Sequence, residues 1–410
     1  MSWLIRYKKI SSPVKVMVLL EFFLQLINTA YFMVFNFYLN DLGFDDSFIA
    51  QLLSYRFIAT MLLALPLGLF VKKRRIVPIF RFATICIPLA SFLVLYSSAA
   101  HKTSLMTLGI FLMGIGTTIA QSLMIPFIMR NEAKETRMQA IALHFTTWSI
   151  TTFLLGMFCY ASRYLLGSAP SEESILLGVT GLALVGSVIA LFPIKEIIPT
   201  GKLVSSGFND YDWNKIGQIL LPAFIIGVGA GLTIPFINLF FLHSFSMSTE
   251  DFLLMGSIST IFVTFGSMYG PRLAERFGNI TSIVCSQTIA VTALVVMAFS
   301  SFFTNSPIAL VVACLCYLIR QPLMNLANPI LSGFTMSYVG PKNQELASAL
   351  QQSLWAGSWY FSSQLFAWMR SEGLPFASVL LTTAMIYSLG VFCYFLLLRR
   401  DSRRPSVVAF

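Results

Sequence analysis

Residues 279–303 have the sequence NITSIVCSQTIAVTALVVMAFSSFF, a run that contains no Asp, Glu, Lys or Arg. An α-helix rises about 1.5 Å per residue, so this run can cross the roughly 30 Å hydrocarbon core of a bilayer. A strand in lipid would need a closed barrel, and barrel strands show short alternating patterns instead of long apolar runs. The stretch therefore predicts a transmembrane helix.

Runs of this kind recur along the whole chain. Of the 410 residues, 57% are apolar and 11% are charged, which leaves no stretch between the runs long enough for a soluble domain. We predict an all-α membrane protein with twelve transmembrane helices. The predicted spans are roughly 16–39, 47–70, 76–98, 104–128, 138–162, 174–194, 216–242, 251–270, 279–303, 307–331, 346–369 and 375–398.

The net charge of +10 is distributed asymmetrically along the chain. If the N-terminus is cytoplasmic, most Lys and Arg fall on the inner segments, and only Lys102, Arg163 and Arg370 fall on the outer ones. This asymmetry is the positive-inside pattern, so we expect a protein of the bacterial inner membrane with both termini in the cytoplasm. A nucleic-acid partner is not needed to explain the charge.

The chain divides into two similar halves. A polar stretch, 195–215, lies at its midpoint and predicts a cytoplasmic linker between an N-terminal bundle, 1–194, and a C-terminal bundle, 216–410. Short matches between the halves occur in the same order and at nearly constant offset, which indicates a duplicated six-helix unit. The matches are Asn36–Leu39 with Asn238–Phe241, Gln121–Met124 with Gln321–Met324, and Ala142, Leu143 and Trp148 with Ala349, Leu350 and Trp355.

A loop motif between the eighth and ninth spans carries a family resemblance. Residues 270–278, GPRLAERFG, resemble the second copy of the signature loop of the major facilitator superfamily. The resemblance covers essentially the whole chain and implies two pseudo-symmetric six-helix bundles that work by alternating access. It also implies a cytoplasmic gate formed by Gly270, Arg272, Glu275, Arg276 and Gly278. The first copy, 68–75, departs from the pattern because GLFVKKRR lacks the acidic residue and the closing Gly.

Among the ionisable side chains inside the predicted spans, we single out Glu21, Arg56, His144 and Arg320. A charge at the bilayer centre costs about 2.5–3.5 kcal/mol even on lenient insertion scales, so such residues are candidates for function. We therefore consider the two Arg residues as candidates for substrate binding, and Glu21 and His144 as candidates for proton transfer.

Arg320 begins a polar stripe that includes Gln321 and Asn325. The family resemblance implies that this helix lines the central cavity, so we predict that Arg320 contacts substrate or a gate. The alternative is that Arg320 only fixes helix packing. A guanidinium group binds carboxylate, phosphate or sulfate in bidentate fashion, which favours an anionic solute if Arg56 and Arg320 face one cavity.

The role of Arg56 stays open at this point. The resemblance places its helix between the halves, so packing or gating is as good an interpretation as substrate contact. Asn28 and Trp355 are further candidates for contact with substrate.

Proton coupling requires a group that changes its charge between two states. Apart from Asp251, the first residue of its span, Glu21 is the only acidic residue within a predicted span, and His144 lies near the inner end of the fifth span. We predict these two as proton-coupling residues. For Glu21 the alternative is a partly solvated salt bridge with Arg81 or a loop cation.

The seventh predicted span contains Gly227, Gly229 and Gly231 followed by Pro235. Closely spaced glycines and a proline weaken the hydrogen-bond ladder of a helix, which predicts a bend or an unwound turn near mid-depth. Close packing of helices through small residues explains the glycines equally well.

The most consistent function is a secondary active transporter that moves a small organic solute. A proton-coupled multidrug efflux antiporter is an alternative, although residues 151–156 lack the Gly-Pro element of such exporters. A lipid or lysolipid transporter is a second alternative. We expect no enzymatic activity, cofactor or metal, and a monomer whose partners are its solute, membrane lipids and, with coupling, protons.

Overall fold

The computed structural model describes residues 8–71, 74–197, 211–304, 306–340 and 343–402. Over these ranges the chain forms α-helices and one short 3₁₀ helix, with no strand. The predicted linker at 195–215 lies mostly outside the described residues.

Within the described ranges, eleven helices are long and apolar enough to cross a membrane. A twelfth helix, α14 (Gln344–Ser371), has the same length but a more polar sequence, so the prediction of twelve spanning helices is confirmed. The other helices are α2 (Ser12–Met33) with α3 (Phe35–Asp41), α4 (Asp46–Val71), α5 (Val77–Ala99), α6 (Thr103–Asn131), α7 (Arg137–Leu166), α8 (Glu172–Ala190), α9 (Trp213–Thr233) with α10 (Ile237–Phe245), α11 (Thr249–Phe277), α12 (Asn279–Ser300), α13 (Pro307–Val339) and α15 (Phe376–Ser402).

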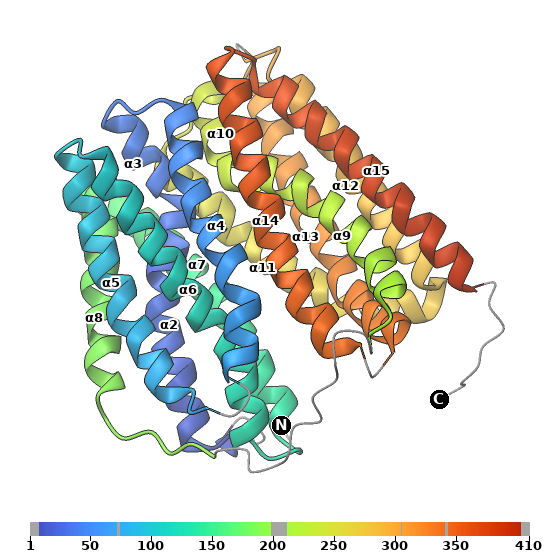
Figure 1. The fold of residues 1–410 in the computed structure, drawn as a ribbon. Helices are drawn as coiled ribbons and strands as arrows, with labels where there is room; N and C mark the ends of the chain where they lie inside the picture. The colour runs from blue at the N-terminus through green and yellow to red at the C-terminus, as the bar shows by residue number, and fades with distance from the viewer. Residues whose placement is uncertain (1–7, 72–73, 198–210, 305, 341–342, 403–410) are drawn as a thin grey trace. The chain divides into compact units, whose positions relative to one another are not determined.

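The helices form two compact units. The first consists of Met1–Val204 together with Met247–Ser257, and the second of Ser205–Ser246 together with Ile258–Phe410. In the first unit α2 packs against α5, α6, α7 and α8, and α6 packs against α4 and α5. In the second unit α9 packs against α14 and α15, and α12 packs against α13 and α15. Figure 1 shows these bundles with α2 and α9 each beside the partners named here.

The seventh span is interrupted, but at its proline instead of at its glycines. A 3₁₀ helix, Ile234–Phe236, separates α9 from α10 and contains Pro235. A proline lacks the N–H that would continue the ladder, which explains the position of the break.

The glycines of α9 serve close packing. A Cβ atom on Gly229 would lie 3.1 Å from the Tyr387 ring, and one on Gly231 would lie 2.7 Å from the Trp359 backbone. The span therefore shows both predicted features: an interruption at Pro235 and close helix packing at the glycines.

The start of α2 is fixed by a carboxylate from the end of α6. Glu132 accepts hydrogen bonds from the Ser11 backbone N–H at 3.0 Å and the Ser11 hydroxyl at 2.7 Å, and also from the Thr136 hydroxyl. Burial alone would raise the pKa of Glu132, but these hydrogen bonds outweigh burial and hold the pKa below its ordinary value. The carboxylate therefore stays ionised at neutral pH and anchors the N-terminus of α2.

Helices α4 and α6 approach closely at the level of Arg56. A Cβ atom on Gly114 would lie 2.7 Å from the carbonyl oxygen of Arg56 and 2.8 Å from the Cβ of Ala59. Only glycine leaves room for this approach, so Gly114 determines how deeply the Arg56 segment is set into the first unit.

We expect Gly114→Ala to destabilise the protein by about 1–3 kcal/mol, because the added methyl group forces α4 and α6 apart. The matched control is Gly178→Ala in α8, where a Cβ atom would meet nothing within 4 Å. Alanine is the better helix former, so the control should be neutral or slightly stabilising. Thermal unfolding in detergent measures both variants, and equal melting temperatures would contradict the close approach.

Candidate functional site

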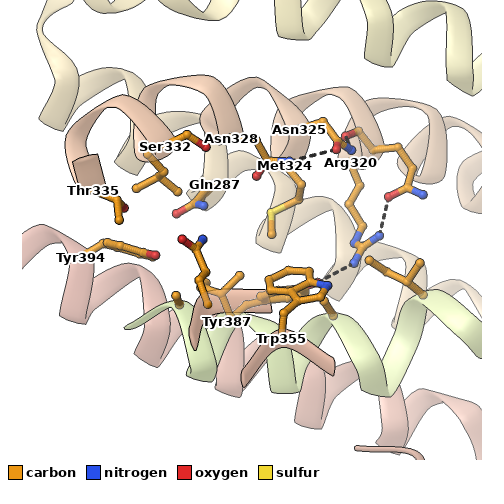
Figure 2. A pocket seen from close by; sticks show the side chains of 17 residues that line it. Gln287, Arg320, Met324, Asn325, Asn328, Ser332, Thr335, Trp355, Tyr387 and Tyr394 are labelled. Atoms are coloured by element: carbon orange, nitrogen blue, oxygen red, sulfur yellow. Dashed lines mark hydrogen bonds between the residues drawn. The ribbon is translucent and has the colours of Figure 1, made fainter. Parts of the chain in front are cut away.

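A polar cavity of about 280 Å³ lies inside the second unit, lined by α9, α12, α13, α14 and α15. Four of the predicted substrate-binding residues line it: Arg320, Gln321, Asn325 and Trp355. Figure 2 shows Arg320 at one end of this cavity and Thr335 and Tyr394 at the other.

Arg320 is 1% exposed. Its Nη1 donates to Gln321 Oε1 at 2.8 Å, and its Nη2 donates to the Tyr387 hydroxyl at 3.2 Å. The guanidinium carbon also lies 5.6 Å from the centre of the Tyr387 ring. These partners are neutral, so they orient the guanidinium without neutralising its charge.

The helices that line the cavity supply no carboxylate at the depth of Arg320. The sequences of α9, α12 and α13 contain no Asp or Glu, and the acidic residues of α14 and α15, Glu345 and Asp401, lie at helix ends. Buried charges in proteins are normally paired, because an unpaired one loses its hydration without compensation. Within the described ranges, Arg320 therefore places a positive charge on the cavity wall that no carboxylate of the lining helices pairs with.

The polar stripe predicted on this helix follows the cavity. Asn325 Nδ2 donates to the Gln321 carbonyl oxygen at 2.8 Å, and Asn328 Nδ2 donates to Asn325 Oδ1 at 3.1 Å. Gln321 Nε2 donates to the Tyr317 hydroxyl at 3.5 Å. These side chains lie three and four residues apart, which puts them on one face of α13.

Sequence reasoning missed several residues of the cavity wall. Gln287 of α12 is 1% exposed, and its Oε1 has no hydrogen-bond partner among the described residues. Gln287 could have been singled out from the sequence, because it places an amide side chain in the middle of the apolar run 279–303. A buried amide needs hydrogen-bond partners, which an apolar helix does not supply. Tyr387 and Tyr394 of α15 gave no such signal, since aromatic residues are common in every span.

In the first unit the two predicted proton-coupling residues meet. His144 Nδ1 lies 2.7 Å from Glu21 Oε2, and both side chains are buried. The alternative partner for Glu21 was wrong, because the Arg81 side chain instead donates to the Phe192 carbonyl oxygen at 2.8 Å. A carboxylate and an imidazole in direct contact can share or exchange one proton.

A series of amides connects this pair with Arg56. Glu21, Gln25 and Asn28 of α2 line a cavity of about 10 Å³, which has room for one water molecule at most. Asn28 Nδ2 donates to Gln25 Oε1 at 2.8 Å, and Arg56 Nη2 donates to Asn28 Oδ1. Three predicted residues, Glu21, Asn28 and Arg56, therefore belong to one polar track.

The predicted gate residues lie at the end of α11 and the start of α12. Gly270 is sterically required, because a Cβ atom there would lie 2.5 Å from the Leu326 carbonyl oxygen. Gly278 joins the two helices with a φ of +82°, a conformation that favours glycine. Between the two glycines lie the exposed Arg272, Glu275 and Arg276.

Two of these gate arginines contact aromatic rings. The guanidinium carbon of Arg272 lies 5.6 Å from the centre of the Tyr269 ring, and that of Arg276 lies 5.2 Å from the Phe277 ring. Their charges are therefore held at the surface of the second unit.

Residues 68–75 lack an acidic residue, and Glu196 provides a carboxylate close to the end of this segment. Its carboxylate accepts from the backbone N–H groups of Ile76 at 2.6 Å and Val77 at 3.1 Å, at the N-terminus of α5. Arg130 lies 4.0 Å from the same carboxylate and donates to the carbonyl oxygens of Val71 and Arg74 at 2.8 and 2.9 Å. A carboxylate after α8 thus caps α5 and links it to α6.

The model of the family described as Major Facilitator Superfamily matches residues 17–363. The chain belongs to the Major Facilitator Superfamily. The resemblance inferred from residues 270–278 is thereby confirmed. A search of curated proteins found no match to this superfamily member.

Solved structures of other superfamily transporters have the same fold. The nucleoside transporter NupG is 16% identical with a TM-score of 0.70, and the comparison covers 94% of this chain and 99% of NupG. A bacterial homologue of the human lysosomal transporter Spinster is 14% identical with a TM-score of 0.73, with coverage of 96% and 98%. A D-xylose-proton symporter is 13% identical with a TM-score of 0.72, with coverage of 93% and 96%.

We expect Glu196→Gln to lower the stability of the first unit by about 0.5–1 kcal/mol, because the variant loses the charge that favours the N-terminus of α5. Glu275→Gln is the control, since Glu275 is exposed on the other unit. Thermal unfolding of the two variants in detergent gives the comparison. If both variants melt at the wild-type temperature, the Glu196 carboxylate does not stabilise the N-terminus of α5.

Proposed function

We propose that this protein is a proton-coupled secondary transporter for a small organic anion. The observation that carries the proposal is Arg320, a buried cation in a polar cavity with no carboxylate from its own helices. An anionic group on the solute would supply the missing counter-charge. The guanidinium fork offers parallel N–H donors for a carboxylate, a phosphate or a sulfate.

Membership of the superfamily supports transport as the activity. Of the neighbours named above, NupG is a nucleoside transporter and another is a D-xylose-proton symporter by title, and a further neighbour is described as a peptide transporter. At these low identities the likeness concerns the fold alone, so the solute of this protein must be argued from its own cavity. The charge asymmetry of the loops supports insertion in a bacterial inner membrane with both termini cytoplasmic.

The contact between Glu21 and His144 supports coupling to protons. A buried carboxylate beside an imidazole is neutral as a pair when the two groups hold one proton together, and adding a second proton makes the pair cationic. The amide side chains of Gln25 and Asn28 connect this pair to Arg56. Gain or loss of a proton would change the electrostatic environment of Arg56 and so couple protonation to the conformation of the first unit.

We expect Arg320→Gln to weaken binding of small carboxylates about 100-fold, because it removes a charge-assisted contact that is shielded from water. Arg320→Lys should bind with intermediate affinity, since it keeps the charge but loses the planar fork. Ligand-induced shifts in melting temperature of the purified protein measure both effects. The control is Arg400→Gln, which removes an exposed arginine at the end of α15.

The same variant separates binding from helix packing. Without ligand, the Arg320→Gln protein should be at least as stable as the wild type, because an uncompensated buried charge is removed. A large loss of stability without ligand, together with unchanged carboxylate binding, would make Arg320 a structural residue and would overturn the proposal.

We expect Glu21→Gln to abolish accumulation of solute driven by a pH gradient, because glutamine cannot take up a proton. Exchange of labelled for unlabelled solute across proteoliposomes at equal pH should persist, since exchange requires no net proton movement. Glu135→Gln, at an exposed carboxylate after α6, serves as the control. Gradient-driven accumulation that survives in Glu21→Gln would remove this residue from the coupling mechanism.

A further inference from the structure

One residue that lines the cavity of the second unit, Gln287, has a buried hydrogen-bond acceptor without a donor among the described residues. Gln287 lines the cavity, is 1% exposed, and its Oε1 makes no hydrogen bond within the described part of the chain. An unsatisfied buried polar atom is destabilising, so native proteins seldom retain one unless a ligand or water completes it. In Figure 2 the Gln287 side chain lies between the Arg320 end and the Tyr394 end of the cavity.

The acceptor on Gln287 limits the chemistry of the solute. An ionised carboxylate or sulfate, or a doubly ionised phosphate ester, has no hydrogen to donate, so such a group on Arg320 cannot also satisfy Gln287 Oε1. The solute must therefore carry a second group with an O–H or N–H donor. An ammonium group would need its own counter-charge, and α9, α12 and α13 contain no Asp or Glu. A hydroxyl group meets the requirement without adding a charge.

The rest of the wall is also suited to hydroxyl groups. Asn325, Asn328, Ser332 and Thr335 of α13 place neutral amides and hydroxyls along the cavity, and these groups can both donate to and accept from an alcohol. Trp355 of α14 adds an indole, a flat apolar surface against which the C–H face of a saturated ring can pack.

The size of the cavity favours a compact solute. Its volume of about 280 Å³ is below the range of roughly 300–1,000 Å³ that is typical of pockets for drug-sized ligands. A solute with one small ring fits this space better than a lipid with long acyl chains.

We infer that the solute is a polyhydroxylated anion of monosaccharide size, such as a sugar acid, with its anionic group on Arg320 and a hydroxyl on Gln287. This inference rests on the proposed function and makes it more specific. Gln287 acts as a specificity residue that selects hydroxylated anions over unsubstituted ones of the same charge and ring size.

The test compares three probes that differ by one feature each. D-glucuronate has a ring, hydroxyls and a carboxylate, cyclohexanecarboxylate has the ring and the carboxylate alone, and D-glucose has the ring and hydroxyls without the charge. Melting temperatures are titrated with each probe for the wild type, Gln287→Met and Arg320→Gln. Methionine keeps the length of glutamine and removes its hydrogen bonds, and Gln352→Met, at an exposed position of α14, is the matched control.

We expect the wild type and Gln352→Met to bind glucuronate at least tenfold more tightly than either other probe. Gln287→Met should lose about tenfold in affinity for glucuronate and nothing for cyclohexanecarboxylate. Equal binding of the two carboxylates by the wild type, unaltered in Gln287→Met, would overturn this inference and leave the anion proposal intact. Binding of glucose as tight as that of glucuronate, or carboxylate binding that survives in Arg320→Gln, would overturn the anion proposal itself.

Discussion

The buried charge of Arg320 is the constraint on which the organisation of the second unit depends. A guanidinium at this depth is stable only if its environment is polar, and the surrounding helices meet that need with neutral groups, Gln321 and Tyr387. Neutral partners hold the side chain in place without cancelling its charge. Under the proposed function, an anionic solute would compensate this charge, and some stability would be given up for binding.

The first unit handles its buried charges differently. Glu21 and His144 come from helices α2 and α7, and each compensates the other by direct contact. Arg56 has the amide of Asn28 as its partner instead of a carboxylate. The second unit thus has the cation Arg320 on a cavity wall, and the first unit has the Glu21–His144 pair, which can change its protonation. The two properties are what a transporter needs if it couples anion movement to protons.

Much of this organisation was predictable from the sequence, because it depends on short-range patterns. Run length and charge distribution predicted the helices, and the spacing of Gln321 and Asn325 predicted a polar face on the helix of Arg320. The GPRLAERFG loop at 270–278 predicted the family. Each of these signals is contained in neighbouring residues or in one helical turn.

The remaining features depend on packing between helices that are distant in sequence. Glu21 and His144 are 123 residues apart, so no local pattern could pair them. The contact of Glu196 with the N-terminus of α5, and the position of Tyr387 beside Arg320, are likewise tertiary features. Gln287 was visible as a lone amide, but only the structure shows that this residue lines the Arg320 cavity and has a buried side-chain oxygen that is unpaired among the described residues.

The most direct test of the central claim is a crystallographic one. Crystals soaked with a bromine-bearing sugar acid would locate the ligand by anomalous scattering and its carboxylate by difference density. The account predicts the carboxylate within about 3 Å of the Arg320 guanidinium, with the ring beside Trp355. Ligand bound elsewhere, with Arg320 still held only by Gln321 and Tyr387, would contradict it.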